Sequence, residues 1–121
     1  DHGGEPLGIS DEAYGEILRG MIECVAYGTG KRARVDGLEV AAKSGTAQWN
    51  ARERTELAWF TAFAPARDPR IAVTVVVEGL PGENIGGGLA APVAGAVLKR
   101  WKELYFRPGE SVPAEKNARA E

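Results

Sequence analysis

The sequence contains very few of the residues that build metal sites, disulfides and thiol catalysts. Among its 121 residues there is one cysteine and one histidine. A single cysteine, Cys24, cannot form an internal disulfide or supply a metal cluster, and the histidine, His2, stands alone at the N-terminus. We therefore predict no metal, no cofactor and no thiol nucleophile, and we expect Cys24 to pack as a small hydrophobic residue.

Long apolar runs and strong charge of one sign are also missing. No apolar run approaches the roughly 20 residues that a membrane helix needs, and no signal peptide opens the chain. A net charge of −2 gives no overall attraction to nucleic acid or to anionic lipid. We therefore expect no nucleic-acid partner and no transmembrane segment, and a membrane anchor of any parent protein would lie outside this segment.

What is present is an ordinary globular composition. Hydrophobic residues make up 44% of the chain and charged residues 26%, which argues against wholesale disorder. The length suits one domain. Residues 110–121 lack apolar periodicity, so we predict a folded portion at 1–109 and a disordered tail at 110–121.

Two segments have helical periodicity. Ser10 is placed to cap a helix that starts with the acidic residues Asp11 and Glu12, and Gly28 and Gly30 end it. The second helix follows Gly88, with Pro92 in its first turn. The apolar positions of the first helix repeat every three or four residues: Tyr14, Ile17, Leu18, Met21, Ile22 and Val25.

Three segments between these helices are predicted strands, at 38–48, 57–64 and 71–78. The tight turn at 67–70 implies an antiparallel hairpin. The resulting fold class is α+β, a three-stranded antiparallel sheet flanked by helices. The valine-rich strand 71–78 is expected at the centre of the sheet, and the strand that carries Lys43 at an edge.

The two glycine clusters and the three tryptophans have simpler interpretations. Gly28-Thr29-Gly30-Lys31 lacks the residues that complete a phosphate-binding loop, and 86–88 is predicted to be a flexible turn. Trp59 and Trp101 lie in predicted elements and are expected in the core. Trp49 directly follows the Lys43 strand and is a candidate for the rim of a binding cleft.

The segment Lys43-Ser44-Gly45-Thr46 places a cation, two hydroxyls and a glycine on a predicted strand. A Lys-Ser/Thr-Gly triplet forms one wall of a class of serine acyl-transfer sites, beside a Ser-x-x-Lys nucleophile and a Ser-x-Asn motif. The chain has three serines, and none begins either of those two motifs. In isolation the tetrapeptide is far more typical of an exposed loop or strand edge than of a catalytic site.

The flanking sequence resembles a known family, the C-terminal part of the transpeptidase domain of class B penicillin-binding proteins, nearest the cell-elongation type. The resemblance covers most of the chain. It depends on the order and spacing of five segments, at 20–30, 41–48, 59–65, 71–78 and 86–92.

The resemblance implies a D,D-transpeptidase that cross-links peptidoglycan through a serine acyl-enzyme and is acylated by β-lactams. It also implies the roles of the motif residues. Lys43 would hold the hydroxyl of the missing second motif, and the backbone N–H of Thr46 would be one of two oxyanion-hole donors. Ser44 and Thr46 would bind the substrate carboxylate, Gly45 would leave room for substrate, and Trp49 is a further candidate for substrate binding.

The partners that follow from this resemblance are the peptidoglycan stem peptide, β-lactam antibiotics and the missing upstream part of the domain. The parent would be membrane-anchored with this domain on the extracytoplasmic face, and the present chain alone would be inactive. Two alternatives remain open. One is a non-catalytic binding or scaffold module of the same fold, and the other is a small α+β interaction domain that self-associates through its exposed strand edge.

Overall fold

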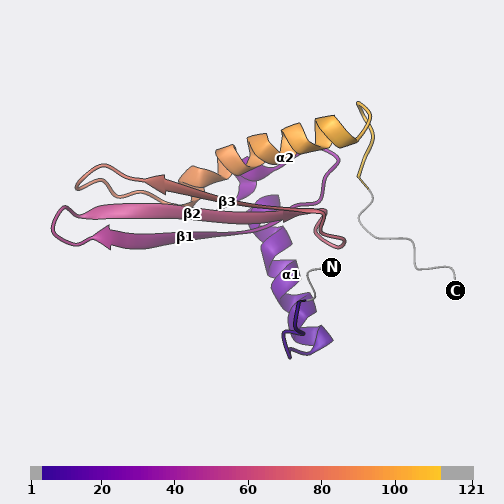
Figure 1. Cartoon of the computed structure of the whole chain (residues 1–121), viewed down its shortest axis with the longest axis horizontal. Coiled ribbons are helices and arrows are strands. Elements are labelled where there is room, and N and C mark those ends of the chain that lie inside the picture. Colours follow the sequence, from indigo (N-terminus) through magenta and orange to yellow (C-terminus); the bar gives the residue numbers. More distant parts are fainter. Residues whose placement is uncertain (1–3, 113–121) are drawn as a thin grey trace, which may run out of the picture.

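The structure of the chain is a computed structural model that describes residues 4–112. It consists of an antiparallel sheet with one helix along a face and a second helix at a steep angle to the strands (Figure 1). This arrangement confirms the α+β fold class predicted from the sequence. Within residues 4–112 the elements are, in order, α1 (Asp11–Ala26), the 3₁₀ helix η1 (Lys31–Ala33), β1 (Ala41–Asn50), β2 (Thr55–Ala64), β3 (Ile71–Glu78), the 3₁₀ helix η2 (Gly87–Ala90) and α2 (Ala91–Tyr105).

Helix α1 begins and ends where its sequence predicts. The Ser10 hydroxyl accepts a hydrogen bond from the Ala13 backbone N–H at 3.1 Å, which satisfies one of the free amides of the first turn. Leu18 and Val25 are its buried residues. They pack into different clusters, because α1 crosses the edge of the sheet beside the start of β1.

The strand boundaries differ by a few residues from those predicted. β1 starts at Ala41, because Leu38 instead forms an isolated bridge with Val35. β2 starts at Thr55, immediately after a turn in which the Asn50 side chain accepts hydrogen bonds from two backbone amides, those of Arg52 and Glu53. This local bonding by asparagine closes the hairpin between β1 and β2.

The prediction that the valine-rich strand is central was wrong for the described residues. The strand order is β1-β2-β3, so β2 is central and β3 is an edge strand. Both connections are hairpins, which place the middle strand of the sequence in the middle of the sheet. Residues of β3 alternate between half-buried and exposed instead of being buried on both faces.

One face of the sheet, here called the α2 face, holds the main core. Phe60 and Leu98 are completely buried there, one from the central strand and one from α2. Small side chains allow the helix to approach the sheet and η1 closely. At Gly95 an added Cβ would lie only 2.9 Å from the Cα of Ala33, so α2 touches η1 through backbone.

The opposite face, here called the open face, is largely uncovered in the described chain. Lys43, Thr61 and Thr74 lie opposite one another across the three strands, and the two threonine hydroxyls are 3.1 Å apart. In the next row Trp59 is 41% exposed and Val76 44% exposed. The core position predicted for Trp59 was therefore wrong, because strand alternation directs it away from α2.

The C-terminal part of the described chain returns to the start of β1. Trp101 packs half-buried against the core, as predicted. Val112 is buried, and its N–H donates a hydrogen bond to the Gly37 carbonyl at 2.9 Å. Residues 110–112 of the tail predicted at 110–121 are thus described by the structure, while residues 113–121 lie outside the described residues, as does His2.

Candidate functional site

The motif residues lie together on β1, the edge strand of the sheet. Strand alternation places Lys43 and Gly45 on the open face and Ser44 and Thr46 on the α2 face. Ser44 is half-buried, and the other three are exposed. The expected edge position of this strand is confirmed, so one side of its backbone is left unpaired by the sheet.

The ammonium of Lys43 lies along its own strand. Its Nζ donates a hydrogen bond to the Ser44 carbonyl oxygen at 2.5 Å. None of the ion pairs found among residues 4–112 includes Lys43. Because an ammonium has three donors, two remain for a hydroxyl or an anion brought to this face from elsewhere.

Ser44 turns its hydroxyl toward the loop after α1. Its Oγ is 2.8 Å from the Oγ1 of Thr29, and Thr29 Oγ1 is 3.6 Å from the Sγ of Cys24. A hydroxyl can donate one hydrogen bond and accept two, so Ser44 keeps capacity for two further hydrogen bonds. The carboxylate-binding role predicted for Ser44 stays a prediction.

Gly45 is not required by its neighbours on the open face. A Cβ built there would meet only the Cβ of Trp59, at the ordinary contact distance of 3.8 Å. An alanine would therefore fit within the described fold. The prediction that the missing side chain leaves room for a ligand remains a prediction, and the space above this residue is compatible with it.

Trp49 projects from the strand just beyond the motif. The pairing of β1 with β2 is irregular between Gln48 and Asn50, and Trp49 lies in that irregularity with 66% of its surface exposed. A large exposed aromatic side chain at the end of a motif strand suits a ligand contact. No contact within the described chain assigns it that role.

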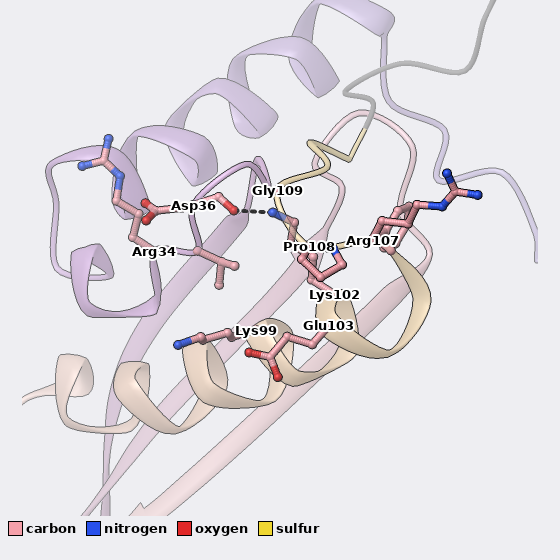
Figure 2. A pocket seen from close by; sticks show the side chains of 10 residues that line it. Arg34, Asp36, Lys99, Lys102, Glu103, Arg107, Pro108 and Gly109 are labelled. Carbon is pink, nitrogen blue, oxygen red and sulfur yellow. Dashed lines mark hydrogen bonds between the residues drawn. The ribbon is translucent and has the colours of Figure 1, made fainter.

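A separate cavity lies between α2 and the segment that precedes β1 (Figure 2). Lys102 donates a hydrogen bond to the Asp36 carbonyl at 2.7 Å beside it. None of the residues that line this cavity belongs to β1. Its lining carries both signs of charge, from Arg34, Asp36, Lys99, Lys102, Glu103 and Arg107. We therefore do not assign it to the motif.

Within residues 4–112 no three His, Cys, Asp or Glu side chains gather as a possible metal site. None of the helices in that range has the length and apolar character needed to cross a bilayer.

Sequence reasoning missed two residues that contact the motif, Thr29 and Gly87. Thr29 was interpreted only as part of a helix end, and Gly87 as part of a flexible turn. The turn is instead held in place, because Ile85 is buried and its N–H donates to the Glu56 carboxylate at 3.0 Å. The glycine clusters at 28–30 and 86–88 were the available signal, since glycine allows backbones to approach closely.

An α+β fold with a Lys-Ser-Gly triplet on the edge strand of its antiparallel sheet is typical of serine penicillin-recognising domains. The family model for the penicillin binding protein transpeptidase domain matches residues 5–99. The chain therefore belongs to the penicillin-binding protein transpeptidase domain family.

Similar proteins agree with this assignment. Stage V sporulation protein D of Bacillus subtilis is 38% identical over 106 residues, which cover 83% of this chain and 16% of that protein. Peptidoglycan D,D-transpeptidase MrdA of Haemophilus influenzae is 42% identical over 104 residues, covering 71% of this chain and 15% of that protein. The chain thus spans about a sixth of the length of these relatives.

Solved structures show the same fold. The transpeptidase domain of FtsI4 D,D-transpeptidase from Legionella pneumophila matches with a TM-score of 0.64 and 32% identity, covering 77% of this chain and 37% of that one. An imipenem acyl-enzyme complex of penicillin-binding protein A from M. tuberculosis matches with a TM-score of 0.55 and 30% identity, covering 75% and 20%. The resemblance seen in the sequence is therefore confirmed.

Proposed function

We propose that residues 1–109 are the C-terminal portion of the transpeptidase domain of a longer peptidoglycan D,D-transpeptidase. The observation that carries this proposal is the Lys-Ser-Gly triplet on an accessible edge strand. The parent cross-links cell-wall stem peptides through a serine acyl-enzyme. β-Lactams acylate the same serine, a proposal supported by the imipenem acyl-enzyme complex of the mycobacterial neighbour.

In this proposal β1 lines one side of the active site and supplies its positive charge and one oxyanion-hole donor. The Lys43 ammonium holds the hydroxyl of the second motif and adds positive charge beside the substrate carboxylate. The Thr46 N–H stabilises the oxyanion, and such a donor typically contributes roughly 2.7 to 4 kcal/mol to transition-state stabilisation. The hydroxyls of Ser44 and Thr46 bind the terminal carboxylate, Gly45 admits the substrate and Trp49 borders the cleft.

The remaining parts of the site come from upstream sequence. None of the three serines of this chain begins a Ser-x-x-Lys motif, so the nucleophile and the second oxyanion donor belong to the missing portion. Three surfaces that residues 4–112 leave largely uncovered support its docking here. They are the open face, the free edge of β3 and an apolar groove on α2 lined by Val93, Ala96, Val97, Arg100, Trp101 and Leu104.

The location proposed for the parent follows from its substrate. Peptidoglycan stem peptides are cross-linked on the extracytoplasmic face of the cell membrane, so the domain works there and the membrane anchor belongs to the parent. The name of one relative described above, peptidoglycan D,D-transpeptidase MrdA, supports the substrate from which this location follows.

A fluorescent penicillin tests the proposed function. The 121-residue chain should remain unlabelled, because it has neither a Ser-x-x-Lys serine nor a complete oxyanion hole, whereas the native full-length parent should form a covalent adduct. Heat-denatured parent is the control for non-specific labelling. A labelled isolated chain would contradict the division of the site, and a native parent that takes no label would favour the non-catalytic scaffold.

Self-association is the second candidate role, and the free edge of β3 favours it. An eight-residue strand with one side unpaired among residues 4–112 can pair with another copy. This role requires a concentration-dependent oligomer of the 121-residue chain in analytical ultracentrifugation. Edge pairing of the isolated chain is compatible with an enzymatic parent, in which upstream sequence would occupy the same edge.

A further inference from the structure

Gly87 lies in close contact with the backbone of β1, the strand that carries the motif. An added Cβ at Gly87 would lie 2.8 Å from both the N and the O of Gly45 and 3.0 Å from its carbonyl carbon. Contacts this short are with backbone, which cannot rotate away as a flexible side chain can. Only a glycine therefore allows η2 to rest against Gly45 in this position.

This contact acts directly on the proposed oxyanion donor. The carbonyl of Gly45 and the N–H of Thr46 belong to one rigid peptide plane. Any displacement of the Gly45 carbonyl therefore tilts the Thr46 N–H. Since an oxyanion donor must lie about 2.7 to 3.1 Å from the developing charge, a small tilt is costly.

Thr29 holds the residue before Gly45. Its hydroxyl is 2.8 Å from that of Ser44. Gly88 in turn lies against Thr29, where an added Cβ would be 2.8 Å from the Thr29 carbonyl oxygen. The loop after α1, the motif strand and η2 are thus in mutual contact, and two consecutive motif residues are held from outside the strand.

Both supporting segments are themselves anchored. Ile85, just before η2, is buried and bonded to the Glu56 carboxylate through its N–H. The loop after α1 is bonded through the Gly30 N–H to the Cys24 carbonyl at 3.0 Å. Because one segment is bonded to β2 and the other to α1, the two together can hold β1 in a fixed position.

We infer that Gly87 and Thr29 are positioning residues that fix the Gly45–Thr46 peptide for oxyanion stabilisation. This inference rests on the proposed function. Neither residue touches substrate in it; they act through the motif strand. The expected signature is a change in the rate of acylation with little change in the affinity of the preceding non-covalent complex.

Gly87→Ala in the full-length parent is the first test. We expect the acylation rate constant for a β-lactam to fall on the order of a hundredfold, the effect of a misplacement of about 1 Å in a catalytic group. Gly86→Ala is the matched control, because nothing lies within 4 Å of an added Cβ there and its φ of −84° suits alanine. Equal acylation by both variants and the wild type would overturn the role of Gly87.

Thr29→Val and Thr29→Ser form the second test, which does not depend on catalysis. In the 121-residue chain, Val should shift the backbone amide resonances of Gly45 and Thr46 and speed their hydrogen exchange, whereas Ser should restore the wild-type values. In the parent, Val should slow acylation about five- to tenfold, the worth of one hydrogen bond. Unchanged Gly45 and Thr46 amides in Thr29→Val would overturn the inference.

The proposed function and the positioning inference would be overturned by different results. If the wild-type parent takes no penicillin, the proposed function fails, while the amide resonances still decide whether Thr29 fixes the strand. If the wild-type parent is acylated and both Gly87→Ala and Thr29→Val match it, the function stands and the positioning inference is overturned.

Discussion

Lys43→Ala in the full-length parent is expected to slow acylation by a β-lactam on the order of a hundred- to a thousandfold. The reason is electrostatic. The Lys43 ammonium is free of ion pairs among the described residues and stands on the open face, where it can act on a developing charge and on a neighbouring hydroxyl. Loss of one preorganised donor in such a site typically costs a factor of this size. Stopped-flow measurement of acylation gives the rate.

The same substitution should leave the fold intact. Lys43 is exposed, and its hydrogen bond to the Ser44 carbonyl stays within its own strand. Surface substitutions of this kind usually change the free energy of unfolding by less than about 0.5 kcal/mol. Lys43→Arg is the matched control that keeps the charge. A Lys43→Ala protein that melts normally and is acylated at the wild-type rate would remove Lys43 from the mechanism.

Gly95→Ala is expected to destabilise the 121-residue chain by about 1 to 3 kcal/mol, the usual cost of overpacking. An added methyl would lie 2.9 Å from the Cα of Ala33 and 3.1 Å from the Arg32 carbonyl oxygen. Both atoms are backbone, so α2 or η1 must move. Urea denaturation followed by circular dichroism measures the change in the free energy of unfolding.

Gly20→Ala is the control for Gly95→Ala, and we expect it to change the free energy of unfolding in the opposite direction. Gly20 lies inside α1 and is exposed, and nothing is within 4 Å of an added Cβ. Alanine should therefore stabilise the chain by about 0.5 to 1 kcal/mol through helix propensity. Equal effects of the two substitutions would contradict the close packing of α2 on η1.

The parts of the fold that follow local rules could be predicted. Ser10 caps α1 because its hydroxyl reaches an amide three residues ahead, and β3 spans 71–78 because β-branched residues favour a strand. The tight turn at 67–70 likewise predicted the antiparallel pairing of the two strands that it joins. These features depend on neighbours in the sequence, so the sequence alone is enough to predict them.

The arrangement of the strands could not be read from apolar content alone. The valines of β3 favoured a central position, but β3 is the last strand of the described sheet and its residues alternate between half-buried and exposed. Trp59 was expected in the core for a similar reason. Its 41% exposure depends on what covers its part of the open face, since in the described chain α1 packs only on the other end of that face, against Ala41 and Phe63.

The motif was found from sequence, while its supports were not. Lys43, Ser44, Gly45 and Thr46 are consecutive, so their spacing is visible in the chain. Thr29 and Gly87 contact the same strand from 15 or more residues away in the sequence. A glycine also has no side chain whose chemistry would indicate such a contact. Only the folded backbone brings these residues together.

The most direct test of the account is a crystal structure of the parent acylated by a β-lactam. The account predicts that the carbonyl oxygen of the acyl group lies about 2.7 to 3.1 Å from the backbone nitrogen of Thr46, with the acylated serine upstream of Asp1. The Lys43 ammonium should face the same site. An acyl oxygen more than about 4 Å from that nitrogen would contradict the claim that β1 supplies the Thr46 N–H to the oxyanion hole. An adduct on a serine of this chain would contradict the claim that the nucleophile lies upstream.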